Sequence, residues 1–307
     1  MTKIIEADRS FSVWWHLTRP HTLTASFAPV ILGTMIALVI EQQAINWLLF
    51  FTMLVASMLI QAATNMFNEY YDYKRGLDNE DSVGIGGTIV RHGVAPKTIL
   101  QIALVLYALA ALLGIYICAM SSWWLAVVGL ICMLIGYLYT GGPLPIAYTP
   151  FGELVSGAVM GMGIVLIAFF IQVGSVTLES VLLSIPSMIL VGAIMLANNI
   201  RDIVGDEEGG RKTLAILVGR QNAIYILSIF FIVSYLWIVG LVIIEDLSYW
   251  ALLVLFSIPF PIKAIDIFNH KEKPIDCMPA MKYTSKTNTI FAFLLSAGLL
   301  ISYLFSQ

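Results

Sequence analysis

Long apolar stretches separated by short polar segments run along most of the chain. Nine of these stretches approach the length that a helix needs to cross the roughly 30 Å hydrocarbon core of a bilayer. They are predicted at Leu23–Ile40, Trp47–Thr64, Thr98–Cys118, Trp123–Tyr139, Leu154–Gln172, Val181–Ala197, Ala223–Ile244, Ser248–Pro259 and Thr289–Phe305. Pro259 and Pro261 interrupt the eighth stretch. The pattern predicts an all-α polytopic membrane protein in which residues 1–307 form a single integral-membrane domain.

The composition agrees with a membrane protein. Of 307 residues, 59% are hydrophobic and 11% are charged, a bias too large to be buried in one soluble core. The three cysteines, Cys118, Cys132 and Cys277, show no paired spacing, which argues against a disulfide framework and against a zinc site. The expected partner of the chain is the lipid bilayer; we expect no nucleic-acid partner and predict no protein partner.

Basic residues are confined to one side of the predicted topology. All 16 Lys and Arg lie in the N-terminal segment 1–22 or in the segments that follow the second, fourth, sixth and eighth spans. The charged residues of the alternate segments are all acids: Glu41, Glu179, Glu245 and Asp246. Because basic residues favour the cytoplasmic side when loops are short, we expect a multi-pass protein of the cytoplasmic membrane with a cytoplasmic N-terminus.

Two of the cytoplasmic segments, 65–97 and 198–221, are long and polar, and we predict them to be active-site loops. Both contain the spacing N-x-x-x-D, in NEYYD from Asn68 and in NNIRD from Asn198. Each copy stands just beyond an apolar span, so the pair forms a weak internal repeat. Asn65, at the end of the second span, is interpreted as a helix cap.

The spacing of the polar residues places those of the second motif on one face of a helix. Asn198, Asp202 and Asp206 stand at i, i+4 and i+8, which places them on one side of any helix that continues past the sixth span. In the first motif, Gly76 occupies the third position and Asp78 follows two residues later.

The chemistry of these side chains favours a magnesium diphosphate site. Carboxylate and amide oxygens without nearby His or Cys suit a hard cation, and Mg²⁺ commonly binds through carboxylates together with the phosphates of a substrate. The candidate ligands are Asn68, Asp72, Asp78, Asn198, Asp202 and Asp206. Interleaved basic residues would hold the remaining phosphate charge: Lys74, Arg75, Arg201, Arg211 and Lys212. Either motif alone also fits ordinary solvated charge, and the second copy is what favours a shared site.

The strings NEYYDYKRGLD and NNIRDIVGDEEGGRKTLAILVG resemble the two signature loops of the UbiA superfamily of intramembrane aromatic prenyltransferases. Two further stretches, RPHTLTASFAPVILGT and GYLYTGGPLPIAYTPFGEL, together with the N-N-x-R-D form of the second loop, are similar to the branch that prenylates 1,4-dihydroxy-2-naphthoate in menaquinone synthesis. The resemblance covers almost the whole chain, in order.

This resemblance implies helices packed around a central cavity that opens to the cytoplasm. It also implies Mg²⁺-dependent transfer of a polyprenyl group from polyprenyl diphosphate to 1,4-dihydroxy-2-naphthoate, with loss of carbon dioxide, giving demethylmenaquinone. By position, Asn68 and Asp72 match the first metal-binding motif, and Asp202 and Asp206 match the second. Arg211 matches the basic position of the G-[K/R]-x-T-L element that follows.

The implied reaction assigns roles to further residues. Once the diphosphate leaves, the allylic carbon becomes cationic and needs dry surroundings with π faces. Tyr137 and Tyr139, near the end of the fourth span, are candidates for those faces, although belt tyrosines at a membrane interface would look the same. We expect Tyr139 to act in catalysis with Asp72 and Asp202. Arg19 is placed to pair with the carboxylate of the acceptor.

Gly76 departs from the pattern of many relatives outside this branch, which carry a third acid there, and Asp78 is the candidate substitute. Three alternatives remain open. A secondary transporter would place carboxylates near the bilayer midplane, where these spans carry no charge. A phosphatidyl-transferring enzyme would show a D-G-x-x-A-R string, which is missing here. A UbiA-type enzyme with another aromatic acceptor, such as 4-hydroxybenzoate, is the third.

Overall fold

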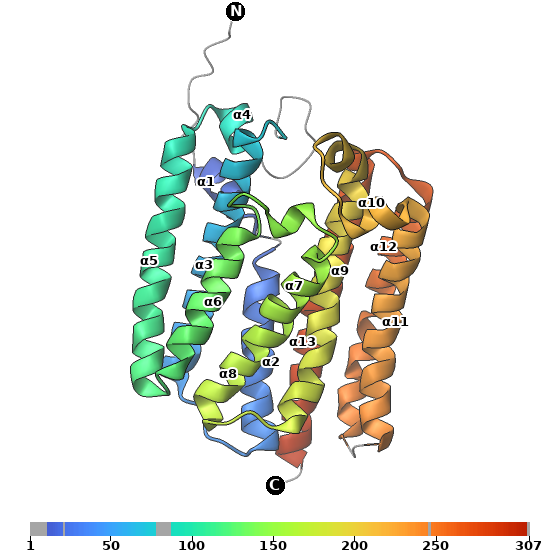
Figure 1. Ribbon diagram of the computed structural model, residues 1–307. Coiled ribbons are helices and arrows are strands. Elements are labelled where there is room, and N and C mark those ends of the chain that lie inside the picture. The colour runs from blue at the N-terminus through green and yellow to red at the C-terminus, as the bar shows by residue number, and fades with distance from the viewer. Residues whose placement is uncertain (1–10, 21, 78–86, 245–246, 306–307) are drawn as a thin grey trace, which may run out of the picture.

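A computed structural model describes residues 11–20, 22–77, 87–244 and 247–305. Long helices lie side by side in one bundle, and no strand occurs in the described parts of the chain (Figure 1). The α-helices are α1 Phe11–Leu17, α2 Thr24–Ile40, α3 Trp47–Lys74, α4 Thr88–His92, α5 Pro96–Met120, α6 Trp124–Leu138, α7 Gly152–Ser156, α8 Ile164–Val173, α9 Leu178–Glu208, α10 Leu214–Val218, α11 Arg220–Ile244, α12 Pro259–His270 and α13 Pro274–Phe305. Two 3₁₀-helices, η1 Ile146–Tyr148 and η3 Tyr249–Ser257, and one π-helix, η2 Gly157–Gly163, accompany them.

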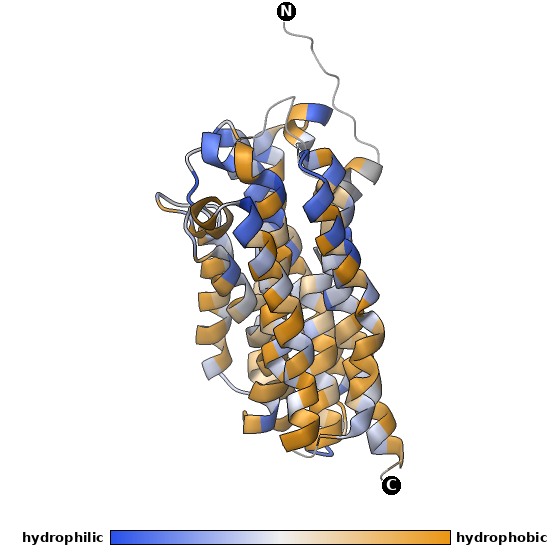
Figure 2. Cartoon of the chain, turned by 90° about the vertical axis from the view of Figure 1, so that its right-hand side faces the viewer, coloured by the Kyte–Doolittle hydropathy of each residue, from blue (hydrophilic) through white to orange (hydrophobic). Residues whose placement is uncertain are grey.

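Within the described residues, seven helical segments are long and apolar enough to cross a membrane. Two shorter apolar helices, α2 and α6, stand where the first and fourth spans are predicted. Apolar residues cover the length of the bundle, and hydrophilic residues gather at the end that carries α4 and α10, here called the motif end (Figure 2). The predicted all-α multi-pass membrane architecture is confirmed, whereas the exact number of nine crossings stays a prediction.

The two helices that carry the motifs run further than the apolar stretches that predict them. At the motif end α3 continues past Thr64 to Lys74, and α9 continues past Ala197 to Glu208. Both N-x-x-x-D motifs therefore lie on helices, and the segments expected to be loops begin as helix. The hydropathy of the sequence marks where a span leaves the hydrocarbon core of the bilayer. The backbone hydrogen bonds of a helix can continue beyond that point into the polar layer, so the helix ends later than the apolar stretch.

The two helices that carry the motifs are anchored at their other ends. Asn46 caps α3 by accepting from the Leu49 N–H at 3.1 Å. Thr177 caps α9 in a capping box with Ser180. Pro186 cannot donate to the Leu182 carbonyl within α9, and the indole of Trp237 donates to that oxygen instead, at 2.9 Å.

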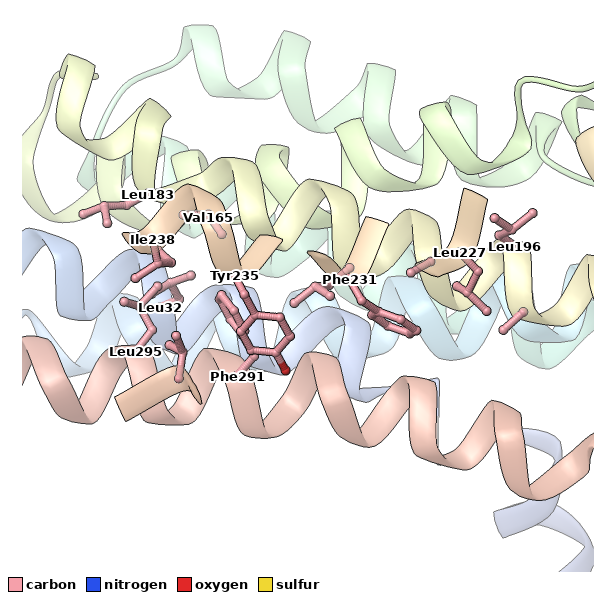
Figure 3. Packing of buried hydrophobic residues seen from close by; sticks show 14 of the residues in the cluster. Leu32, Val165, Leu183, Leu196, Leu227, Phe231, Tyr235, Ile238, Phe291 and Leu295 are labelled. Atoms are coloured by element: carbon pink, nitrogen blue, oxygen red, sulfur yellow. The ribbon is translucent and has the colours of Figure 1, made fainter. Parts of the chain in front are cut away.

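The core lies among α2, α8, α9, α11 and α13, where apolar side chains from these helices interdigitate (Figure 3). The rings of Tyr235 and Phe291 are 5.3 Å apart at its centre. Close backbone approach supports the packing: a Cβ on Gly33 of α2 would lie 2.2 Å from the Val165 oxygen of α8, so only glycine fits. A second, aromatic cluster joins α3, α5 and α6, where Phe67 is edge-on to two tyrosine rings.

Candidate active site

The two acidic motifs meet at the motif end of the bundle. Arg211, just beyond α9, donates from Nη2 to Asp72 Oδ1 at 2.6 Å and from Nη1 to Asp206 Oδ1 at 2.9 Å. Gly210, at φ 76°, turns the chain back so that the Arg211 N–H also donates to the Asp206 carbonyl. One guanidinium therefore bridges α3 and α9.

This bridge is largely shielded from solvent. The side chains of Arg211, Asp72 and Asp206 are 13%, 14% and 8% exposed. Burial opposes the charge on Arg211, but the carboxylates of Asp72 and Asp206 outweigh it and raise the pKa of the guanidinium above its ordinary value. Arg211 is therefore a permanent cation at the centre of the site.

A second arginine extends the network through an amide. With its side chain oriented to satisfy both neighbours, Asn68 donates to Asp72 Oδ2 at 3.2 Å and accepts from Arg19 Nη1 at 3.3 Å. Arg19 Nη2 also lies 3.7 Å from Glu69 Oε2. Arg19 has a φ of 50°, a conformation that a non-glycine residue adopts only when its surroundings hold it there.

Glu69 is the residue that positions Arg19. Its side chain is 1% exposed, and its two oxygens accept from the N–H groups of Gly87, at 2.9 Å, and Ile89, at 3.2 Å. Glu69 thereby fixes the start of α4 as well as Arg19. Nothing in the sequence pattern separates Glu69 from solvated acids; only its helical register, four residues after Asn65, places it on an inward face.

Arg75, predicted to bind diphosphate, holds a loop. Its guanidinium donates to the carbonyl of Gly142 at 2.9 Å and to that of Thr140, both in the connection between α6 and α7. It also lies 5.3 Å from the ring centres of Tyr71 and Tyr148. These contacts hold the loop formed by residues 139–149 against the C-terminal end of α3.

Tyr148 joins the two arginines. The centre of its ring lies 5.2 Å from the guanidinium carbon of Arg211 and 5.3 Å from that of Arg75. Its carbonyl accepts from the Lys212 N–H at 3.0 Å. The side chains of Lys74 and Lys212 are exposed, and Lys74 lies 6.0 Å from the Tyr70 ring.

The remaining predicted ligands have different surroundings. Asp202 is 31% exposed and pairs with its neighbour Arg201, whose Nε donates to Oδ1 at 2.6 Å. Asn198 lines the cavity described below. Asp78 lies outside the described residues. In the described part of the chain, no group of three or more His, Cys, Asp or Glu is arranged to hold a metal ion.

A cavity of about 430 Å³ extends from this network into the bundle between α2, α3, α5, α6, η2 and α9. Its motif end is polar, with Arg19, Asn68, Tyr139 and Asn198, and most of its remaining wall is apolar. Tyr137 does not belong to this lining: its hydroxyl shares a 2.6 Å hydrogen bond with Tyr71 and its ring packs on Phe67. Of the two candidate π faces, the structure places Tyr139 at the cavity.

The arrangement fits a hard divalent cation bound with a diphosphate. Asn68 and Asn198 line the polar end of the cavity, and Asp72, which bonds Asn68, and Asp206 stand further along the same two helices. Carboxylate and amide oxygens are the ligands that Mg²⁺ prefers. Asp206 Oδ2 is buried and has no hydrogen-bond partner within the described part of the chain, and such an oxygen is costly unless a cation or donor reaches it. Asp72 and Asp206 already share one cationic group, which shows that both face the same point.

Sequence relatives cover the chain almost completely. The UbiA prenyltransferase family matches residues 26–285. A 1,4-dihydroxy-2-naphthoate octaprenyltransferase of Bacillus subtilis is 60% identical over 291 residues, covering 95% of this chain and 93% of its own. The enzyme of that name from Mycobacterium tuberculosis is 34% identical over 218 residues, covering 70% of this chain and 74% of its own.

Solved structures share the fold. A UbiA homolog from Archaeoglobus fulgidus bound to DMAPP and Mg²⁺ has a TM-score of 0.61 at 14% identity and covers 92% of this chain and 99% of its own. An apo UbiA homolog from Aeropyrum pernix K1 has a TM-score of 0.65 at 16% identity and covers 92% of this chain and 98% of its own.

Proposed function

The chain belongs to the UbiA prenyltransferase family, and from this we propose that it prenylates 1,4-dihydroxy-2-naphthoate. The substrate is a polyprenyl diphosphate, and the acceptor loses its carboxylate as carbon dioxide to give demethylmenaquinone in its reduced, quinol form, with diphosphate as the leaving group. The observation that carries the proposal is 60% identity, over 95% of the chain, to a relative named for this activity. The meeting of both acidic motifs at the mouth of an apolar cavity supports it.

We assign the diphosphate to the mouth of the cavity. Asn68, Asp72 and Asp206 would hold Mg²⁺ there, joined by Asn198 and Asp202 from the same helix as Asp206. The bound ion would neutralise the charge that develops on the leaving diphosphate. Arg211 stands among these acids, so its guanidinium is placed to donate to the phosphate oxygens from the protein side.

The cavity wall serves the second half of the reaction, in which the allylic carbon bonds to the acceptor. The bond between the allylic carbon and the diphosphate oxygen breaks, and a ring carbon of the acceptor forms the new carbon–carbon bond. Tyr139 lines the cavity beside the motifs, where its ring faces the developing allylic cation. The apolar lining excludes water that would otherwise capture this cation.

Arg19 is the proposed partner of the acceptor's carboxylate. It lines the cavity, its side chain is 20% exposed, and it contacts Glu69 and Asn68. Because the carboxylate leaves as carbon dioxide, this contact is made in the bound acceptor and lost in the product. We place the site on the cytoplasmic face of the cell membrane, where a water-soluble acid reaches it while the prenyl tail enters from the lipid.

The test is turnover by membranes that contain the protein, supplied with labelled polyprenyl diphosphate. We expect prenylation of 1,4-dihydroxy-2-naphthoate, carbon dioxide release in proportion to product, and little turnover of 4-hydroxybenzoate. A higher kcat/KM for 4-hydroxybenzoate would overturn the acceptor assignment and leave prenyl transfer standing.

A further inference from the structure

A second polar cluster lines the cavity deeper than the acidic motifs. It consists of Gln61 and Asn65 on α3 and Thr22 just before α2, and all three belong to the cavity lining. Gln61, Asn65 and Asn68 follow one another at helical spacing on one face of α3. Asn65 lies inside α3 and not at its end, so its interpretation as a helix cap is wrong.

Hydrogen bonds fix the orientation of every amide in this cluster. Asn65 Nδ2 donates to the Thr18 carbonyl and to Thr22 Oγ1, both at 2.9 Å. Thr22 Oγ1 in turn donates to the Arg19 carbonyl at 2.9 Å. Asn65 Oδ1 accepts from Gln61 Nε2 at 3.3 Å, and the same nitrogen lies 3.5 Å from Thr22 Oγ1.

Gln61 is the member of the cluster with bonding capacity left over. Its nitrogen faces Asn65 and Thr22, which turns its carbonyl oxygen, Oε1, away from them. That oxygen has no hydrogen-bond partner among the described residues, although the residue is only 8% exposed. An amide oxygen held in this way in a mostly apolar cavity is a preset acceptor for a ligand's O–H group.

We propose that Gln61 is a specificity-determining residue whose Oε1 accepts a hydrogen bond from a ring hydroxyl of the aromatic acid. This rests on the proposed function, which places the acid's carboxylate at Arg19. Gln61 lies seven residues before Asn68, about 10 Å along the helix axis, and Asn68 accepts a hydrogen bond from Arg19. Arg19 and Gln61 therefore stand at the two ends of a space suited to a fused-ring acid. Thr22 connects the two ends, because its hydroxyl bonds the Arg19 backbone.

The bond would do more than select the acceptor. A hydroxyl that donates to an amide oxygen shares its proton and leaves more electron density on the ring, which favours attack on the allylic cation. No proton, electron or group is transferred to Gln61 in this role. In a cavity of low dielectric constant the effect of such a bond is larger than in water.

The test compares Gln61→Met, which keeps the length of the side chain and removes its oxygen, with Thr52→Val. Thr52 lies on the same helix, bonds the Leu48 carbonyl and stands outside the cavity lining, so it is a matched polar-to-apolar control. Competitive inhibition of prenylation is measured with 2-naphthoate and with its 1-hydroxy and 4-hydroxy derivatives. These probes report binding without needing to react.

In the wild type and in Thr52→Val, we expect one hydroxy derivative to bind at least about 10-fold more tightly than 2-naphthoate. In Gln61→Met this advantage should fall to within about 3-fold, with the affinity for 2-naphthoate and the KM for polyprenyl diphosphate unchanged. Gln61→Leu should reproduce the loss if Gln61→Met is poorly folded.

Two results would overturn the inference: a hydroxyl advantage that persists in both Gln61 variants, or one that is already missing in the wild type. Failure of the proposed function is distinct, because then the wild type would not prenylate 1,4-dihydroxy-2-naphthoate at all.

Discussion

Arg211 is the residue whose removal tests the architecture of the site most directly. In Arg211→Met, the carboxylates of Asp72 and Asp206 lose the cation they share while remaining 14% and 8% exposed. Breaking a buried ion pair by removing one partner costs roughly 3–5 kcal/mol, because the charge left behind is uncompensated. In chains somewhat smaller than this one, each kcal/mol of lost stability lowers the Tm by about 2–4 °C. We therefore expect the Tm of Arg211→Met to fall by roughly 10 °C.

The assay is thermal unfolding in detergent with EDTA and again with saturating Mg²⁺. Since the same two carboxylates are proposed to hold the ion, Mg²⁺ should stabilise Arg211→Met more than the wild type and restore part of the lost Tm. Activity should not recover, because Arg211 is also proposed to bind the diphosphate. Arg211→Lys should be intermediate, since a single ammonium cannot reproduce the two-pronged bridge.

Lys97→Met is the control for loss of a cation at the motif end. Lys97 is exposed on the first turn of α5, so its removal should change the free energy of unfolding by no more than about 0.5 kcal/mol. The reasoning is refuted if Arg211→Met unfolds at the wild-type temperature in EDTA. Equal stabilisation of both proteins by Mg²⁺ would refute the shared role of the carboxylates.

Further consequences follow for other residues. Asp72→Asn, or EDTA with the wild type, should lower turnover by about 100-fold or more; activity near the wild-type level would remove Asp72 from the site. Tyr148→Phe keeps the ring that contacts both guanidiniums and should stay active, whereas Tyr148→Leu should raise the KM for polyprenyl diphosphate; equal kinetics would show that the ring is dispensable. In a cysteine-free background, impermeant thiol reagents should label Glu207→Cys in inverted vesicles and Glu41→Cys in intact cells, and the reverse pattern would invert the topology. Gly33→Ala should unfold at a lower temperature than the wild type, because its Cβ would lie 2.2 Å from a backbone oxygen of α8; an unchanged Tm would contradict that contact.

Periodicity predicts much of the fold and part of the site. The i, i+4, i+8 spacing of Asn198, Asp202 and Asp206 requires a helix to share one face, and α9 does continue through all three. The same spacing cannot say which carboxylate faces the cavity mouth. Asp206 bonds Arg211, whereas Asp202 pairs with Arg201, its neighbour in the chain.

The partners of the site are set by contacts between distant segments. Asp72 and Arg211 are 139 positions apart, and nothing local to either residue predicts their bond. The same holds for Arg75, whose interleaving with acids favours a phosphate ligand although its guanidinium holds two loop carbonyls. Charge patterns identify the region of a site, while packing decides which cations remain available to the substrate.

The charges of the network indicate why a divalent cation should accompany the diphosphate. Among the described residues, the hydrogen bonds and ion pairs of this network join three carboxylates, those of Glu69, Asp72 and Asp206, to two guanidiniums, those of Arg19 and Arg211. The guanidinium of Arg75 meets the network only through the Tyr148 ring. A diphosphate entering alone would add negative charge to a group that already has an excess of it, in surroundings that screen charge weakly. Mg²⁺ arriving with the diphosphate would offset most of the added negative charge, because it brings positive charge that both the carboxylates and the phosphate oxygens can share. The acids of the two motifs are thus suited to recognise the metal diphosphate as one unit, and the arginines hold them in place for it.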